Sequence, residues 1–315
     1  MCTTFNHAPY ITDTLNGFTN QETTFPYVCC IIDDASVDGE QVIIQKYFDV
    51  NFDYEDSNVG QRIETNDYIL SFARHKTNIN CYFLIVFLKY NHYRKKDKYQ
   101  YISKWYESSK YMAFCEGDDY WINSNKLQKQ YSILENNTNC SMCCHNAIIL
   151  YTQQHKIKSF NEGISEGIMS PKTVIDRWSI PTASFFIRSE CYKYPDWLIH
   201  IYSADIALYL RCLNAGEIYY INEFMSVYRI NTENNSESAR MKGREIYILE
   251  QHNILLDSFN KGTTGRFDKE IKDKINSNKA LIRYYLKRQK GLFFCLFEPV
   301  LYKKIISKYF RTKKI

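Results

Sequence analysis

Two pairs of adjacent aspartates are the residues in this sequence whose types and spacing could do chemistry. Asp33 and Asp34 follow one apolar run, and Asp118 and Asp119 follow another. Carboxylate oxygens are the ligands that Mg²⁺ and Mn²⁺ prefer, and both ions leave open positions for phosphate oxygens. One such pair alone is commonly two solvated turn residues, but two pairs at matching positions favour a shared site. We expect one carboxylate to contact a ribose and another to hold a metal ion.

The apolar runs before the two pairs predict buried strands. Tyr27–Ile32 and Tyr111–Cys115 are continuous and rich in β-forming side chains, which is typical of strands covered on both faces. A helical pattern follows each acidic turn, at Gln41–Tyr47 and after Asn123 or Ser124, and strands that alternate with helices predict a mostly parallel sheet. In such sheets ligands bind beyond the carboxyl ends of the strands. We therefore expect both acidic pairs at one edge, around one pocket.

Apolar periodicity predicts the first helix of the chain and the helix after the second acidic pair. Pro9 suits a first helical turn, and apolar residues then recur at helical spacing: Ile11, Leu15 and Phe18. The later helix has a stripe of the same kind: Leu127, Tyr131 and Leu134. Each stripe predicts one buried helix face.

Composition and charge exclude several classes of protein. The chain has 315 residues, of which 45% are hydrophobic and 24% charged, so it fits one large domain with an appendage or two domains. Its longest apolar run, Cys81–Leu88, is far shorter than the ~20 residues of a membrane-spanning helix. The basic stretch Tyr93–Lys98 is typical of solvated surface, and we expect no nucleic-acid partner. Because no basic region followed by an apolar one opens the sequence, we expect a cytoplasmic protein.

The 11 cysteines predict free, buried thiols in a reducing compartment. One cluster, at Cys140, Cys143 and His145, also permits a zinc interpretation. A structural zinc site wants four ligands, and no second pair follows at a suitable spacing. We therefore expect a buried strand that runs toward Tyr151. His92 and the other isolated histidines are expected at the surface or satisfied in the core.

Five stretches, in this order along the chain, resemble bacterial family 2 glycosyltransferases with a GT-A fold. They are Thr3–Ile11, Ile31–Glu40, Cys115–Trp121 followed by Lys126–Gln130, Ile180–Arg188, and Ala204–Ile230. The resemblance implies an α/β, Rossmann-like GT-A domain over residues 1–230, with a mostly parallel sheet flanked by helices, and a helical C-terminal region over residues 231–315. It also implies transfer of a sugar from a nucleotide-sugar with inversion at the anomeric carbon.

The resemblance assigns a nucleotide-sugar site to residues at the strand ends. Thr3 and Phe5 match positions that border the base. Asp34, with Asp33 beside it, matches the acid that contacts the base and ribose region, and Asp118 matches the acid nearer the ribose. All five residues are therefore expected to bind the donor nucleotide-sugar.

The resemblance also assigns two residues to catalysis. Asp119 matches the ligand of Mg²⁺ or Mn²⁺, an ion that would neutralise charge on the departing diphosphate. Asp205 matches the catalytic base, which would accept the proton from the attacking hydroxyl. The sequence departs from the family pattern at three places. Ala204 stands where relatives often have glycine, Asn231 where many have histidine, and only two residues precede Thr3 where relatives carry several apolar ones.

The expected activity is that of an inverting hexosyl- or N-acetylhexosaminyl-transferase. By the resemblance, the donor is a UDP-sugar, and the acceptor is a glycan or lipid-linked sugar in the synthesis of a surface polysaccharide such as lipopolysaccharide or capsule. Two alternatives remain open at this point. An inactive sugar-nucleotide-binding or scaffold protein would share the same motifs. A nucleotidyltransferase would need a basic residue in its first loop, and Thr3–Pro9 contains no lysine or arginine.

The C-terminal end has the pattern of an interfacial helix. After Pro299, at about 100° per residue, apolar side chains fall on one half of the helix and basic side chains on the other. Basic residues also stand beside the apolar ones of Leu286–Phe297. The pattern predicts peripheral binding to an anionic membrane, at the inner face of the cytoplasmic membrane. The alternative is a terminal helix packed on the catalytic domain, with solvated lysines.

Overall fold

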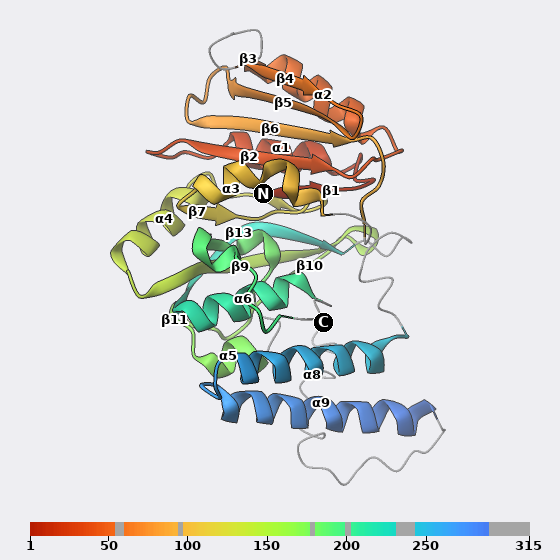
Figure 1. The fold of residues 1–315 in the computed structure, drawn as a ribbon, viewed down its shortest axis with the longest axis vertical. Coiled ribbons are helices and arrows are strands. Elements are labelled where there is room, and N and C mark those ends of the chain that lie inside the picture. The colour runs from red at the N-terminus through yellow and green to blue at the C-terminus, as the bar shows by residue number, and fades with distance from the viewer. Residues whose placement is uncertain (54–59, 94–96, 177–179, 199–202, 231–242, 290–315) are drawn as a thin grey trace. The chain divides into compact units, whose positions relative to one another are not determined.

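The computed structural model describes residues 1–53, 60–93, 97–176, 180–198, 203–230 and 243–289 (Figure 1). Contacts within the chain divide it into two compact units. The first comprises Met1–Met169, Ser179–Lys193 and Ala215–Ile230, and the second comprises Ser170–Trp178, Tyr194–Asn214 and Asn231–Ile315. Both acidic pairs therefore lie in the first unit, and Asp205 lies in the second.

The first sheet of the first unit is mixed. Its strands lie in the order β1 (Cys2–Thr4), β2 (Tyr27–Asp33), β6 (Cys81–Leu88), β5 (Tyr68–His75) and β3 (Phe52–Asp53), and β4 (Gln61–Glu64) also pairs with β5 (Figure 1). β1, β2 and β6 pair in parallel, as predicted, whereas β5 is antiparallel to β6, β4 and β3. The loops before and after β5 are too short for a parallel crossover, so these strands form antiparallel hairpins.

The side chains of β2 alternate between the two faces of the sheet. Helical segments cover both of these faces. One face packs against α1 (Ile11–Thr19) and α2 (Glu40–Asn51), and the other packs against the 3₁₀ turn η1 (Lys98–Ile102) and α3 (Ser103–Ser108). The predicted stripe of α1 is buried: Ile11, Leu15 and Phe18. The prediction of a strand covered on both faces is therefore confirmed.

The second sheet of this unit contains the cysteine cluster. Its strands lie in the order β11 (Gly167–Ile168), β13 (Glu217–Ile230), β9 (Cys140–Tyr151), β12 (Phe186–Arg188) and β7 (Tyr111–Ala113), while β10 (Lys156–Ser159) pairs with β9 and β8 (Tyr120–Trp121) pairs with β13. β9 and β13 are parallel, and the other pairs are antiparallel. Cys140 and Cys143 are buried in β9, so the predicted buried strand is confirmed.

Backbone hydrogen bonds join β1 to the segment that follows β7. The Met1 amine donates to Ala113 O at 2.6 Å. Cys115 N then donates to Met1 O at 3.1 Å, and Gly117 N donates to Thr3 O, also at 3.1 Å. Residue numbers increase together on both sides, so the segment runs parallel to β1. The acidic turn after β7 consequently faces the same edge as the turn after β2.

The helix α4 (Lys126–Asn136) begins slightly later than predicted. Its N-cap is Asn125, which makes no side-chain cap bond, and Asn123 accepts a hydrogen bond from Asn125 N at 2.9 Å.

Lys126 is fully buried, donates from Nζ to Gln130 Oε1 at 2.8 Å, and lies 4.2 Å from the centre of the Trp121 ring. Because burial disfavours the charged ammonium, the pKa of Lys126 falls to about 7. This lysine belongs to the core.

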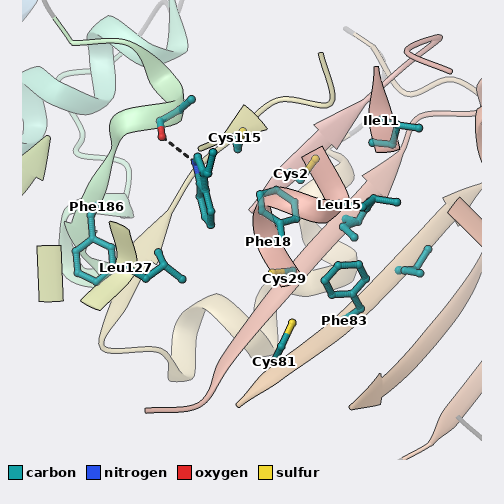
Figure 2. Packing of buried hydrophobic residues seen from close by; sticks show 14 of the residues in the cluster. Cys2, Ile11, Leu15, Phe18, Cys29, Cys81, Phe83, Cys115, Leu127 and Phe186 are labelled. Atoms are coloured by element: carbon teal, nitrogen blue, oxygen red, sulfur yellow. Dashed lines mark hydrogen bonds between the residues drawn. The ribbon is translucent and has the colours of Figure 1, made fainter. Parts of the chain in front are cut away.

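The largest core cluster of the first unit ties α1 to the strands (Figure 2). The Phe18 ring meets that of Phe83 edge-on with centres 6.4 Å apart, and that of Trp121 at 4.8 Å. Trp121 donates from Nε1 to Ala183 O at 2.9 Å, so its polar atom is satisfied inside the core. Gly17 lies so close to the Trp121 backbone that a Cβ would approach it to 2.8 Å. Burial of each such side chain contributes about 1.5–3 kcal/mol, which holds α1 in place.

An apolar cavity of about 560 Å³, partly open to solvent, lies between β2 and β7. Its walls include Phe18, Leu127 and Phe186, which Figure 2 shows, together with Ile102 and Trp105. Among the described residues, those that line this cavity do not include either acidic pair. The cavity is therefore separate from the edge at which the carboxylates gather.

The described part of the second unit is helical. It contains α5 (Pro171–Asp176), α6 (Ala204–Ala215), α8 (Glu245–Gly262) and α9 (Asp268–Gln289). Phe259 of α8 stacks on Phe267 with ring centres 5.6 Å apart, and Gly262 leaves room for Trp197. Within the described ranges, no helix has the length and apolar character of a membrane-spanning segment. The predicted basic tail falls on residues 290–315, which lie outside the described residues.

Candidate functional site

Three strand ends meet at one edge of the first unit. β1 lies between β2 and the segment after β7, and all three run in the same direction. Asp34 N donates to Thr4 O at 3.0 Å, and Gly117 N donates to Thr3 O, so the backbone pairing reaches both acidic turns. The structure thus brings both acidic pairs to one edge. Thr3 and Phe5, both half-buried, lie beside them on the end of β1.

Asp33 is buried and has one carboxylate oxygen in use. Its Oδ1 accepts hydrogen bonds from Ser36 N at 3.0 Å and from Gln41 Nε2 at 2.5 Å. Its Oδ2 is buried and has no hydrogen-bond partner among the described residues. Burial raises the pKa of Asp33, and the two donors oppose that rise. An acceptor that is buried and unused is expensive to leave unpaired, so this oxygen is suited to receive a donor group from a ligand.

Asp34 is also buried, but both of its oxygens are engaged. Oδ1 accepts from His92 N at 2.7 Å, and Oδ2 lies 3.2 Å from Lys98 Nζ. Lys98 was expected on solvated surface, and the structure corrects that expectation, because its ammonium pairs with a carboxylate that is only 1% exposed. His92 is satisfied in the core, since its ring nitrogens lie 2.7 Å from Tyr90 O and 3.1 Å from the Tyr101 hydroxyl. The role of Asp34 toward a base stays a prediction.

Glu40 organises the loop after β1, and the sequence interpretation gave it no role. It is fully buried at the start of α2 and accepts hydrogen bonds from Thr4 Oγ1, from His7 N at 2.9 Å and from Ser36 Oγ at 2.9 Å. The backbone of Asn6, in this loop, lies in the left-handed region at φ 58°, a conformation that asparagine tolerates. An acidic residue in the first turn of a helix is usually interpreted as a charge that stabilises the helix dipole. The sequence therefore gives no separate signal that Glu40 is buried and holds this loop.

Hydrogen bonds from α1 fix the turn that carries the second acidic pair. Thr14 Oγ1 lies 3.0 Å from Gly117 O and 2.6 Å from Asp119 O. Gly117 has no room for a side chain, because a Cβ there would overlap Thr4 Oγ1 and Cβ and would lie 3.0 Å from His7 Nδ1. Glycine at this position therefore lets the acidic turn approach the end of β1.

The two carboxylates of this turn differ in environment. Asp119 is 1% exposed: its Oδ1 accepts from Arg229 N at 2.8 Å, and its Oδ2 has no partner among the described residues. Burial raises the pKa of Asp119 well above its ordinary value, and the negative charges of Asp118 and Glu116 add to the rise. The Asp118 side chain is 20% exposed, and its Oδ2 lies 3.9 Å from His7 Nε2.

Arg229, in β13, clamps the acidic turn and was missed by the sequence interpretation. Its guanidinium is buried, donates from Nη1 to Asp118 O at 2.7 Å and forms an ion pair with Asp13. The same group lies 4.2 Å from the centre of the Tyr120 ring and 5.1 Å from that of Tyr10. A single arginine in an apolar strand could have marked this contact, because such a residue is rarely buried without a partner.

The second acidic pair fits a divalent cation. No group of three His, Cys, Asp or Glu side chains is placed to hold a metal ion within the described part of the chain. Mg²⁺ and Mn²⁺ commonly bind through only one or two carboxylates, with water and substrate phosphates as the other ligands. The unpartnered Oδ2 of Asp119 and the partly exposed carboxylate of Asp118 form such a donor set.

The predicted base, Asp205, lies in the second unit. It is half-buried in the first turn of α6, and its charge adds to the burial that raises the pKa of Tyr209. Asp176, at the end of α5, and Asp196 are also in this unit. Because the acidic pairs belong to the other unit, the role of Asp205 stays a prediction. Asn231 lies outside the described residues.

Comparison with known proteins agrees with this geometry. Residues 2–98 match the family described as Glycosyl transferase family 2. Uncharacterized proteins of Mycobacterium tuberculosis and Mycobacterium bovis are each 27% identical to the chain over 255 residues, which is 79% of this chain and 63% of theirs. The chain thus spans less than two thirds of the length of these relatives.

A solved structure shares the fold over most of the chain. It is that of residues 1–349 of S. aureus TarS in complex with UDP, with a TM-score of 0.51 and 11% sequence identity, covering 93% of this chain and 91% of that one. The α/β architecture is that of a GT-A protein with helices after the second sheet. Residues 2–98 are thus similar to glycosyltransferase family 2, and the chain has a GT-A fold, as the sequence motifs predicted.

Proposed function

We propose that the protein is an inverting glycosyltransferase that moves a hexosyl or N-acetylhexosaminyl group from a UDP-sugar to a hydroxyl of a glycan or lipid-linked acceptor. The observation that carries the proposal is the meeting of the two acidic pairs at one strand edge, within and beside the part of the chain that matches the family. The structural neighbour TarS was solved with UDP, which supports a uridine nucleotide as the donor group.

In this proposal the residues of the edge bind and orient the donor. Thr3 and Phe5 border the base, Asp33 offers its unused oxygen to a donor group of the nucleotide, and Asp118 faces the ribose and diphosphate. Asp119 would hold Mg²⁺ or Mn²⁺, which would neutralise charge on the departing diphosphate. The contacts of Thr14 and Arg229 keep the acidic turn rigid, so its carboxylates need not reorganise during transfer.

Binding of UDP tests the proposed function directly. We expect calorimetry to detect UDP binding that tightens when Mn²⁺ is added, and we expect one of UDP-glucose, UDP-galactose or UDP-N-acetylglucosamine to be hydrolysed slowly without acceptor. ATP serves as the control nucleotide and should bind more weakly. A protein that binds no uridine nucleotide, with or without Mn²⁺, would contradict the proposal.

A sugar-nucleotide-binding protein without transferase activity is the second candidate. The engagement of both Asp34 oxygens by His92 N and Lys98 Nζ favours it, because this carboxylate then has less capacity for a ligand. The donor screen separates the two candidates: both bind UDP, but only an active transferase releases UDP from a nucleotide-sugar.

The proposed base predicts a separation of binding from turnover. Asp205→Asn removes a proton acceptor and keeps the size of the side chain, so we expect normal UDP affinity and turnover at least ~100-fold slower, the usual range for proton-transfer catalysis. Asp176→Asn and Asp196→Asn, two other aspartates of the second unit, are the matched controls and should keep near-normal turnover. If one of them loses turnover and Asp205→Asn does not, the base is that residue.

The basic tail predicts salt-sensitive binding to anionic membranes. We expect the full chain to sediment with phosphatidylglycerol vesicles at low salt and to be released by high salt, since each basic residue near the surface adds about 1 kcal/mol. Truncation after Gln289 should abolish sedimentation and leave UDP binding intact. A cut nearer to Lys279 would fall inside α9, where Ala280 is buried, and would damage the helix. A full chain that stays in the supernatant with these vesicles contradicts the membrane role.

A further inference from the structure

We propose that His7 is a ligand of the divalent cation and binds it together with Asp118. The inference rests on the proposed function, and it assigns to the loop after β1 a part in holding the metal. Two atoms carry it: His7 Nε2 and Asp118 Oδ2 lie 3.9 Å apart, and their side chains are 24% and 20% exposed. That exposure leaves them open to an ion and to the oxygens of a diphosphate.

The hydrogen-bond chain behind His7 defines which ring nitrogen carries the proton. The Thr4 hydroxyl has one hydrogen, which it donates to Glu40 Oε1. His7 Nδ1 lies 3.2 Å from Thr4 Oγ1, so Nδ1 is the donor in that contact when Glu40 is ionised. A neutral imidazole that is protonated at Nδ1 has a bare lone pair at Nε2. That lone pair faces the carboxylate of Asp118.

The separation of the two facing atoms suits a shared ion. Neither neutral imidazole Nε2 nor a carboxylate oxygen has a hydrogen to donate to the other, so the pair has no direct attraction without a cation or an added proton. Two ligand atoms at about 2.1 Å from one ion are between about 3.0 and 4.2 Å apart, from right-angled to opposite positions. The observed 3.9 Å is about 0.3 Å short of the opposite arrangement, so an ion between the two atoms requires only a small movement of the loops.

The surroundings of His7 are those of a supported metal ligand. A histidine that binds a metal usually donates its other N–H to a group that fixes the ring, and the chain from Nδ1 through Thr4 to the buried Glu40 carboxylate does this. Glu40 also accepts from the His7 backbone N–H at 2.9 Å, so one carboxylate fixes both ends of the residue. Independently, the buried Oδ2 of Asp119 has no hydrogen-bond partner among the described residues, which fits a turn that binds a cation.

An imidazole ligand has a consequence for metal preference. Mg²⁺ favours oxygen ligands, whereas nitrogen ligands suit the later divalent ions, and affinity for mixed nitrogen and oxygen sites rises from Mn²⁺ to Co²⁺. A site whose protein ligands are only carboxylates would discriminate little. With His7 as a ligand beside Asp118, the protein should bind Mn²⁺ and Co²⁺ in preference to Mg²⁺ in the presence of UDP.

The test measures metal binding rather than turnover. Titration of the full chain with Mn²⁺ in the presence of UDP, followed by electron paramagnetic resonance, gives the affinity, and competition with Mg²⁺ gives the selectivity. His7→Gln should weaken Mn²⁺ binding at least ~10-fold and reduce the preference over Mg²⁺. Thr4→Val, which removes the group that orients the ring, should weaken Mn²⁺ binding in the same direction by about 10-fold or more. His155→Asn, at an exposed left-handed turn position that asparagine tolerates, is the matched control and should change neither.

Three outcomes would overturn the inference, and they are distinguishable. Unchanged Mn²⁺ affinity and selectivity in His7→Gln, with UDP binding retained, would leave His7 only as an ion-pair partner of Asp118. An equal loss of UDP affinity with and without Mn²⁺ would make His7 a contact of the nucleotide instead. Wild-type protein that binds neither UDP nor Mn²⁺ would overturn the proposed function, and the role of His7 with it.

Discussion

Asp119→Ala is expected to abolish sugar transfer and to remove the Mn²⁺-dependent part of UDP binding while the first unit stays folded. The carboxylate is buried, and one of its oxygens has no partner within the described ranges, so its charge is disfavoured without a cation. Replacing the carboxylate therefore removes the free-energy cost of burying its charge, although the hydrogen bond from Arg229 N is lost. Calorimetry with UDP, with and without Mn²⁺, and circular dichroism measure the two effects.

Glu116→Ala is the control for Asp119→Ala. Glu116 is an exposed acid in the same turn, and its removal lowers the local negative charge by the same amount. We expect this variant to keep Mn²⁺-dependent binding, because its effect acts through charge at a distance and not through a bond to the ion. Metal-dependent UDP binding that survives in Asp119→Ala would show that the metal ligand is another residue.

Gly117→Ala is expected to displace the acidic turn from the end of β1 and to reduce UDP affinity at least ~10-fold. The added Cβ would overlap Thr4 Oγ1 and Cβ, and Thr4 cannot turn away without breaking its bonds to Glu40 and His7. Overpacking of a tight site typically costs about 1–3 kcal/mol of stability, so the thermal midpoint should fall by several degrees. Differential scanning fluorimetry and UDP titration measure the two changes.

Gly163→Ala separates this clash from the general effect of replacing glycine. No atom of the described part of the chain lies within 4 Å of a Cβ built at Gly163, although its φ of 72° disfavours alanine by about 1–2 kcal/mol. We expect that variant to lose some stability and no UDP affinity. If Gly117→Ala binds UDP as tightly as wild type, the close approach of the turn to β1 is not needed for the site.

The parts of the fold that follow from local patterns were predictable. The strand before Asp33 followed from a continuous run of apolar, β-forming residues, and the first helix followed from the 3.6-residue period of Ile11, Leu15 and Phe18. Both elements formed as expected. The shared edge of the two acidic pairs also followed, because the carboxyl ends of parallel strands lie on one side of a sheet. The antiparallel pairs of the first sheet were not predicted, because the direction of β5 depends on the lengths of the loops before and after it.

The contacts that complete the site depend on distant pairing. Arg229 meets Asp119 across 110 positions, and Lys98 meets Asp34 across 64. Which strand residue faces the turn depends on the register of β13, which shifts within the strand. No local pattern reports such a register. The apolar strand around Arg229 therefore indicates a buried partner without saying which one, and a lysine in a basic stretch looks like an ordinary surface charge. Lys126 misleads in the same way, because only the tertiary fold buries it.

The apolar cavity between β2 and β7 leaves apolar surface of the first unit accessible to small molecules. Apolar walls offer a water molecule few hydrogen-bond partners, so an apolar group displaces water from such a site readily. Its volume of about 560 Å³, beside Phe18 and Trp105, falls in the range of small-molecule sites. A fluorescent apolar dye should therefore bind the folded first unit, and larger side chains at the cavity wall would weaken that binding.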